Sequence, residues 1–344
     1  LVRDAEGQFY LDKFRNGGEG DTSLDQLLQM SRLSMYDVNL TFVDELHAEP
    51  PQRFSKIALS LKNSGYTHRV TGHALLPPDI GYRVDVEAEL YGDSDSPESW
   101  QGKLYAKLQA LAFTALPQRY LYDGMALQGV ADIRLWTDVA GLDVHAVNGE
   151  LDSRNLQVSH VKDDQEYHFT AEKLGARFGW RQQEAGWQFV IQQLLVEQQG
   201  HTWKTDNLSL AGINDAQTSR IAGLSSRIKL DGFGALLPVI PGLKPTDRKL
   251  LAGLQPQGLI KDLEFELSTV DGAMQLGDYK ARFSGLGIGE TDGYPLFTGL
   301  DGRITGNLLT GTMTLDSHNA IIQDSKLFRE ALSVQRAQGD IYWE

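Results

Sequence analysis

The sequence predicts an all-β protein: a long antiparallel meandering sheet with few short helices. Segments in which apolar and polar residues alternate recur along the chain, and this period of two is typical of strands with one buried face. Short connections between the segments favour antiparallel neighbours, and alternating strand and helix units are absent. In all, we predict roughly sixteen to twenty strands and only two or three short helices.

The segment from Lys173 to Ile191 shows the alternation most openly. Residues 181–186 are polar and end in glycine, which predicts a hairpin with a short loop between two strand arms. One face of this hairpin carries mostly large aromatic side chains. Such a face must be covered, because a contiguous exposed apolar patch promotes association. The cover is a second sheet, a set of helices or a ligand, and sandwich core is the commonest role of such residues.

Composition excludes several classes of function. The 344 residues include 35 glycines and carry a net charge of -14, which argues against nucleic acid as a partner because phosphate binding needs clustered cations. The absence of cysteine excludes disulfides and thiolate chemistry. No apolar run approaches the length of a membrane span. Because the chain begins at Leu1, we expect a segment of a longer protein whose anchor lies outside these residues.

We divide the chain into four parts. Residues 1–34 hold an N-terminal strand and a short helix, which Ser23 and Gln26 predict over 24–33 through a capping-box pattern. Residues 35–231 form a first β segment. Residues 232–256 are a proline- and glycine-rich insert with a helix over 247–254, which is an internal plug, a boundary or an end cap. Residues 257–344 form a second β segment that continues the same sheet.

No recognised catalytic, cofactor or metal motif is present, so we expect no enzyme activity and no cofactor. The eight histidines lack metal-ligand spacing and are expected on polar or solvent-facing surfaces. Gly285, Gly287 and Gly289 give only part of a dinucleotide fingerprint, and strand turns or bulges explain them more simply. Two carboxylates paired in space for glycoside hydrolysis would leave no trace in the sequence, so a carbohydrate-active β enzyme stays an alternative.

The ordered succession of several segments resembles the YhdP branch of the AsmA-like family, from about residue 30 to the end of the chain. These segments are Tyr36–Asp44, Ile57–Ala74, Trp100–Val161, Leu250–Gly258, Pro295–Gly302 and Gly339–Trp343. The resemblance implies a repeating β-groove, in which a long sheet curls into a taco shape around an apolar lumen. It also implies a periplasmic location in Gram-negative bacteria, with an inner-membrane anchor outside this segment.

The same resemblance implies a bridge-like lipid transfer protein that shields phospholipid acyl chains between the inner and outer membranes. Periplasmic or outer-membrane proteins are possible further partners. The family offers no fixed site residues, so the alternation in this sequence is our basis for predicting which side chains line the groove. They are Val38, Leu40, Phe42, Leu59, Leu61, Val84, Val86, Ile133, Leu135, Phe178, Trp180, Trp187, Phe189, Ile191, Ile304, Met313 and Leu315. A periplasmic scaffold whose sandwich interior is filled by side chains is the main alternative.

Overall fold

The computed structural model describes residues 1–7, 9–10, 30–93, 96, 99–141, 143–162, 165–214, 219–231, 234, 236–240, 243, 248, 250, 253–270, 273–289, 295–324 and 329–344. The chain forms two compact units. The first comprises Leu1–Ala115 and Val130–Asp152, and the second comprises Leu116–Gly129 and Ser153–Glu344. Each is described below by itself.

Nine strands begin in the first 152 residues, and two of them, β8 and β9, contribute residues to both units. They are β1 (Val2–Arg3), β2 (Phe9–Tyr10), β3 (Arg32–Asp44), β4 (Glu49–Ser64), β5 (Thr67–Leu75), β6 (Arg83–Tyr91), β7 (Gln101–Ala112), β8 (Met125–Ala140) and β9 (Asp143–Lys162). The second unit adds β10 (Gln165–Gln183), β11 (Gly186–Gln198), β12 (His201–Asn214), β13 (Ser219–Lys229), β14 (Gln257–Val270), β15 (Ala273–Ile288), β16 (Leu296–Gly306), β17 (Gly311–Gln323) and β18 (Leu332–Trp343).

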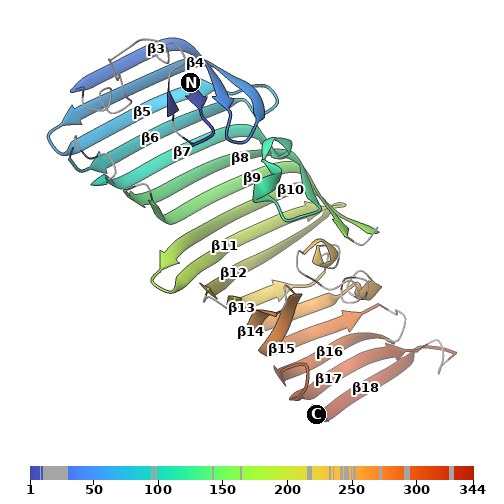
Figure 1. Ribbon diagram of the computed structural model, residues 1–344. Helices are drawn as coiled ribbons and strands as arrows, with labels where there is room; N and C mark the ends of the chain where they lie inside the picture. The colour runs from blue at the N-terminus through green and yellow to red at the C-terminus, as the bar shows by residue number, and fades with distance from the viewer. Residues whose placement is uncertain are drawn as a thin grey trace. The chain divides into compact units, whose positions relative to one another are not determined.

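Within each unit the strands pair antiparallel in chain order, as the successive arrows of Figure 1 show. The one parallel pairing among the described strands joins β1 to β3. The predicted all-β meander is therefore confirmed, and the eighteen strands of the described ranges fall within the predicted number. Asn148 and Gly149 form a dipeptide that is typical of turns, yet both lie inside β9, where the extended backbone continues through the buried Gly149.

Helical structure is sparse among the described residues. Two 3-10 turns, η3 (Phe113–Ala115) and η4 (Gln118–Tyr120), follow β7. The described residues of the predicted helix over 247–254 are helical. Most of the helix predicted over 24–33 lies outside the described residues, and its last two positions, Arg32 and Leu33, belong to β3.

The insert of residues 232–256 packs against the second unit. Its 3-10 turn η6 (Leu237–Val239) contacts β10, and Val239 is buried. The buried guanidinium of Arg248 lies 2.9 Å from the Nδ1 atom of His160 in β9 and 5.2 Å from the ring centre of Tyr167 in β10. The insert therefore covers part of the sheet at β9 and β10.

Bulges keep the apolar side chains on one face where the sequence alternation breaks. Asp37 in β3 and Lys56 in β4 have positive φ values of 54° and 53°, and the register shifts beside both. Their side chains form an ion pair with an Nζ to Oδ1 distance of 2.8 Å. Each bulge adds one residue to its strand, which bends the strand and increases its twist. After the bulge, Val38 stands opposite Ile57 and the apolar row resumes.

Two further bulges are capped by a carboxylate from the next strand. The backbone N–H of Ala110 (φ 50°) donates to Oδ1 of Asp132 over 2.8 Å, and the N–H of Gly285 (φ 60°) donates to Oδ1 of Asp301 over 2.9 Å. A bulged residue loses its place in the hydrogen-bond ladder, and the carboxylate replaces the lost acceptor. The positions of the aspartates are thus tied to the bends of the sheet.

Removing one of these caps should destabilise the first unit. We expect Asp132→Ala to lower the free energy of unfolding by about 1–2 kcal/mol, because the N–H of Ala110 loses its charged acceptor. Urea unfolding followed by circular dichroism measures the change. Asp138→Ala is the matched control, since Asp138 is exposed on the same strand and accepts no hydrogen bond from the described residues. Equal losses in the two variants would contradict a capping role.

Candidate functional site

The first unit has one continuous apolar face. Directly opposed residues of neighbouring strands point to the same side of a sheet, so each cross-strand row defines one face. Two adjacent rows cross from β3 or β5 to β8: Met35, Leu59, Gly72, Val86, Ala106 and Leu135, then Ala74, Val84, Leu108 and Ile133. The nine residues predicted for this unit therefore share a face. Val38, Leu40 and Phe42 join it beyond the bulge at Asp37.

The second unit repeats this arrangement across more strands. One row runs from β10 to β18 through Trp180, Phe189, Leu210, Gly223, Phe265, Tyr279, Gly306, Gly311 and Trp343. Phe178 faces Ile191 in the next row, and Ile304 faces Met313. The eight predicted residues of this unit therefore also lie on a single face. The alternation in the sequence identified the apolar side of each strand. The register places the apolar sides of successive strands next to one another.

Aromatic rings cover glycines along the same face. A Cβ atom placed on Gly212, Gly223 or Gly311 would overlap a ring from the neighbouring strand, that of Trp187, Phe265 or Trp343 respectively. Glycine lowers the strand propensity of a position, and a ring lying over it restores the lost packing. On the apolar face, aromatic rings therefore occupy the space that the side chains of these glycine positions would otherwise fill.

The degree of burial separates this face from a sandwich core. All of the predicted residues except Leu61 are half-buried, whereas Leu61 is 2% exposed. Inward-facing residues of a two-sheet sandwich are buried by the opposite sheet. Part of the face is closed, however, since Val196 and Trp203 in the row beginning at Leu174 are 0% and 3% exposed. The open part of the second unit therefore lies along the row of Trp180 and Phe189.

In each unit the opposite face of the sheet is polar and carries ion pairs. The guanidinium of Arg83 donates two hydrogen bonds to Asp85 and thereby lowers the pKa of that carboxyl. Arg69 likewise donates two bonds to Glu89, over 3.0 and 2.7 Å, and lowers the pKa of Glu89. In the second unit Lys280 pairs with Glu264, and Arg282 pairs with Asp262. These four ion pairs lie on the face away from the apolar rows.

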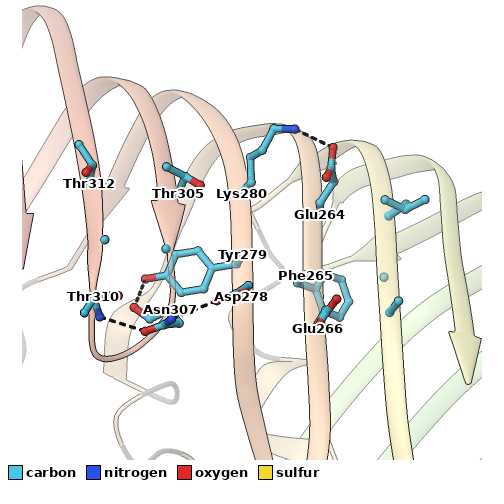
Figure 2. Close-up of a pocket in the computed structure, with 15 residues that line it drawn as sticks. Glu264, Phe265, Glu266, Asp278, Tyr279, Lys280, Thr305, Asn307, Thr310 and Thr312 are labelled. Carbon is cyan, nitrogen blue, oxygen red and sulfur yellow. Dashed lines mark hydrogen bonds and ion pairs between the residues drawn. The ribbon is translucent and has the colours of Figure 1, made fainter. Parts of the chain in front are cut away.

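Figure 2 shows a hollow in the second unit that is lined by polar residues and also by Phe265 and Tyr279 of the long apolar row. Its volume is about 600 Å³, and the ion pair of Lys280 with Glu264 lies on its wall. The amide of Asn307 donates to Asp278 over 3.0 Å and the Asn307 side-chain oxygen accepts from the N–H of Thr310, which fixes the hairpin at one end (Figure 2). Asn307, Asp278 and Thr310 are thus bonded to one another, and Lys280 is paired with Glu264.

The prediction that the histidines lie on polar or solvent-facing surfaces is wrong for two of them. His68 is buried, stacks on Trp100 with ring centres 3.8 Å apart and contacts Asn63 and the carbonyl of Gly92. His160 is buried beside Arg248. Both gain partners from distant parts of the chain, which the sequence alone does not reveal. Within the described ranges, no group of His, Asp and Glu residues is arranged to hold a metal ion.

Sequence reasoning missed several members of the apolar face. They are Val70, Ala88, Leu104, Leu108, Leu208, Leu210, Phe265, Tyr279, Phe283 and Trp343. Each occupies an alternating segment, so the same period-two signal applied to every strand would have found most of them. Among the residues that the structure describes, no helix has the length and hydropathy to cross a membrane.

Comparison with known proteins assigns the chain to a family. The family model described as "YhdP protein" matches residues 5–344. The Intermembrane phospholipid transporter YhdP of Escherichia coli (strain K12) is 20% identical over 297 residues, which cover 83% of this chain and 23% of that protein. The chain thus spans about a quarter of the length of this relative. No solved structure matches. Because the family model covers almost the whole chain, the protein belongs to the YhdP family.

Proposed function

We propose that this chain is a periplasmic segment of a bridge-like lipid transfer protein and that its apolar faces hold phospholipid acyl chains. The half-burial of one continuous apolar face in each unit carries the proposal. The printed name of the Escherichia coli relative, an intermembrane phospholipid transporter, supports the same class of cargo. An anchor in the inner membrane would lie outside these residues, and catalysis plays no part in the proposed role.

The energetics fit this role. Each methylene group removed from water contributes about 0.8 kcal/mol, so a two-chain lipid crosses an aqueous gap only with its tails shielded. Half-buried side chains such as Phe178, Trp180 and Ile191 leave apolar surface for acyl chains to cover. Because a headgroup is costly to bury, it stays in water while the tails lie against the rows. Contacts spread over many such side chains hold a tail without fixing it at one position.

Site-specific photo-crosslinking tests the proposal. We expect benzoylphenylalanine at Leu59 in the first unit and at Ile191 in the second to form adducts with phospholipid in the bacterial host. The matched controls are Lys62 and Gln193, which lie on the same two strands but are exposed on the polar face. Mass spectrometry of the purified adducts identifies the lipid. Labelling at Leu59 and Ile191 should exceed labelling at the controls by about tenfold or more, because the probe and control positions lie on opposite faces of the same strands.

Two results would overturn the proposed function. One is an absence of phospholipid adducts at Leu59 and Ile191 when the protein is expressed and folded. The other is equal labelling of the two faces, because a lipid that adheres without regard to face is not held by the apolar rows. A sandwich scaffold with a filled interior would give adducts to neighbouring protein segments instead.

A further inference from the structure

The polar face of the first unit carries an aromatic pair in a hollow of about 430 Å³. The ring centres of Tyr105 in β7 and Trp136 in β8 lie 5.5 Å apart, with their planes at 44°. The two residues are opposed in the register, on the face away from the apolar rows. Trp136 is 43% exposed, although a large ring is usually more deeply buried. As a directly opposed cross-strand pair the two rings stabilise the sheet, and the exposed part of Trp136 leaves ring surface open to a ligand.

Polar groups frame the rings in two cross-strand rows. Thr71 and Glu87 continue the row of Tyr105 and Trp136. The neighbouring row holds Arg69, Glu89, Lys103 and Asp138, and Asn148 of β9 also lies at the hollow. The ion pair of Arg69 with Glu89 fixes one corner. We call this set of residues, with the two rings, the polar shelf. Val70, Ala88, Leu104 and Thr137, which lie between these positions on their strands, contribute to the lining of the hollow as well.

Several groups of the polar shelf remain available to a ligand. Glu87, Lys103 and Asp138 form no hydrogen bond or ion pair with other residues of the described ranges. Two of them are acceptors and one is a donor, and Asn148 adds both functions. The five charged side chains of the shelf comprise three carboxylates and two cations, so the shelf lacks the positive charge that an anion would require.

This combination matches a sugar. A sugar ring presents an apolar C–H face that packs on an aromatic ring and a rim of hydroxyls that both donate and accept hydrogen bonds. A quaternary or primary ammonium is matched less well, because two rings at 44° leave most of such a cation uncovered and Lys103 repels it. An acyl chain would leave the free carboxylates without partners.

We propose that the polar shelf is a binding site for an uncharged or weakly charged polysaccharide strand, with Trp136 and Tyr105 as the stacking platform and Glu87, Lys103, Asp138 and Asn148 as hydrogen-bonding groups. The site lies on the face opposite the apolar rows. Polysaccharide and acyl chains would therefore occupy different faces of the same sheet, and this proposal does not depend on the proposed function.

Isothermal titration of the purified chain with chitohexaose tests the proposal. We expect saturable binding with a dissociation constant below about 5 mM, and Trp136→Ala should weaken it by about tenfold or more. Trp136→Phe keeps an aromatic platform and should retain part of the affinity. Tyr342→Ala is the control, because Tyr342 is 71% exposed and lies in the second unit. Circular dichroism verifies that each variant is folded. We expect Trp136→Ala to fold, because Trp136 is exposed.

The outcomes separate the possibilities. No saturable binding of chitohexaose, cellohexaose or maltohexaose at about 5 mM would overturn the proposal, as would equal affinity in the wild type and Trp136→Ala. Competition by choline or trilysine at similar concentration would assign the shelf to cations and would also overturn it. Lipid adducts at Leu59 should persist in Trp136→Ala, so failure of the sugar site is distinguishable from failure of the lipid face.

Discussion

Phe189→Asp should strongly lower the amount of phospholipid that we expect to co-purify with the protein through the apolar row of the second unit. Phe189 stands between Trp180 and Leu210 in the long apolar row and is half-buried. A carboxylate at this position would have to lose water when an acyl chain lies on the row, and the unpaired charge costs several kcal/mol. A cost of about 3 kcal/mol corresponds to roughly a 100-fold loss of local occupancy. Quantitative mass spectrometry of lipid per mole of protein, with crosslinking at Ile191, measures the loss.

Gln193→Asp is the matched control for this variant. Gln193 lies on the same strand, is exposed and pairs with Arg177 on the polar face. Its replacement introduces the same charge without placing it on the apolar row, so lipid content should not change. Thermal unfolding of both variants separates a loss of lipid from a loss of fold. If folded Phe189→Asp retains wild-type lipid, the row through Trp180 and Leu210 is not the surface that holds acyl chains.

The sequence was sufficient to predict which side chains of a strand share a face, but not which residues of neighbouring strands lie opposite one another. Alternation between Lys173 and Ile191 placed the aromatic side chains on one side, and the structure pairs Trp180 with Phe189 there. Alternation is local, because it depends only on the pleat of one strand. It therefore survives without knowledge of the partner strand. The joining of many strands into one long row depends on register, which hairpin turns and bulges set.

The features that escaped prediction are those that depend on contacts between distant residues. The αL bulges at Asp37 and Lys56 interrupt the period of two, and their compensation becomes visible only when both strands are aligned. Asn148 and Gly149 resemble a turn signal in isolation, yet β9 continues through them. The docking of the insert through Arg248 on His160 joins residues 88 positions apart. The polar shelf was likewise missed, because its rings come from different strands.

Gly223→Val should destabilise the second unit by about 2–3 kcal/mol, because the new side chain would enter the space of the Phe265 ring. The glycine lies directly opposite Phe265 in the register. Relief of the overlap requires the ring to move off the strand, which breaks its packing in the long row. Chemical denaturation monitored by tryptophan fluorescence measures the change. Gly277→Ala is the control, since its Cβ would lie 3.4 Å from the nearest side-chain atom, an ordinary contact distance.

A double-mutant cycle isolates the ring as the cause. Phe265→Ala alone should cost about 2 kcal/mol or more through lost packing, less than for a fully buried ring because Phe265 is half-buried. If the valine and the ring compete for one space, the double variant loses clearly less than the sum of the two single losses. Additive losses would show that Gly223 is required for its backbone rather than for the ring. The same competition is expected at Gly311 and Trp343. Glycines covered by a ring from the next strand would then be a repeated feature that keeps the apolar face continuous from strand to strand.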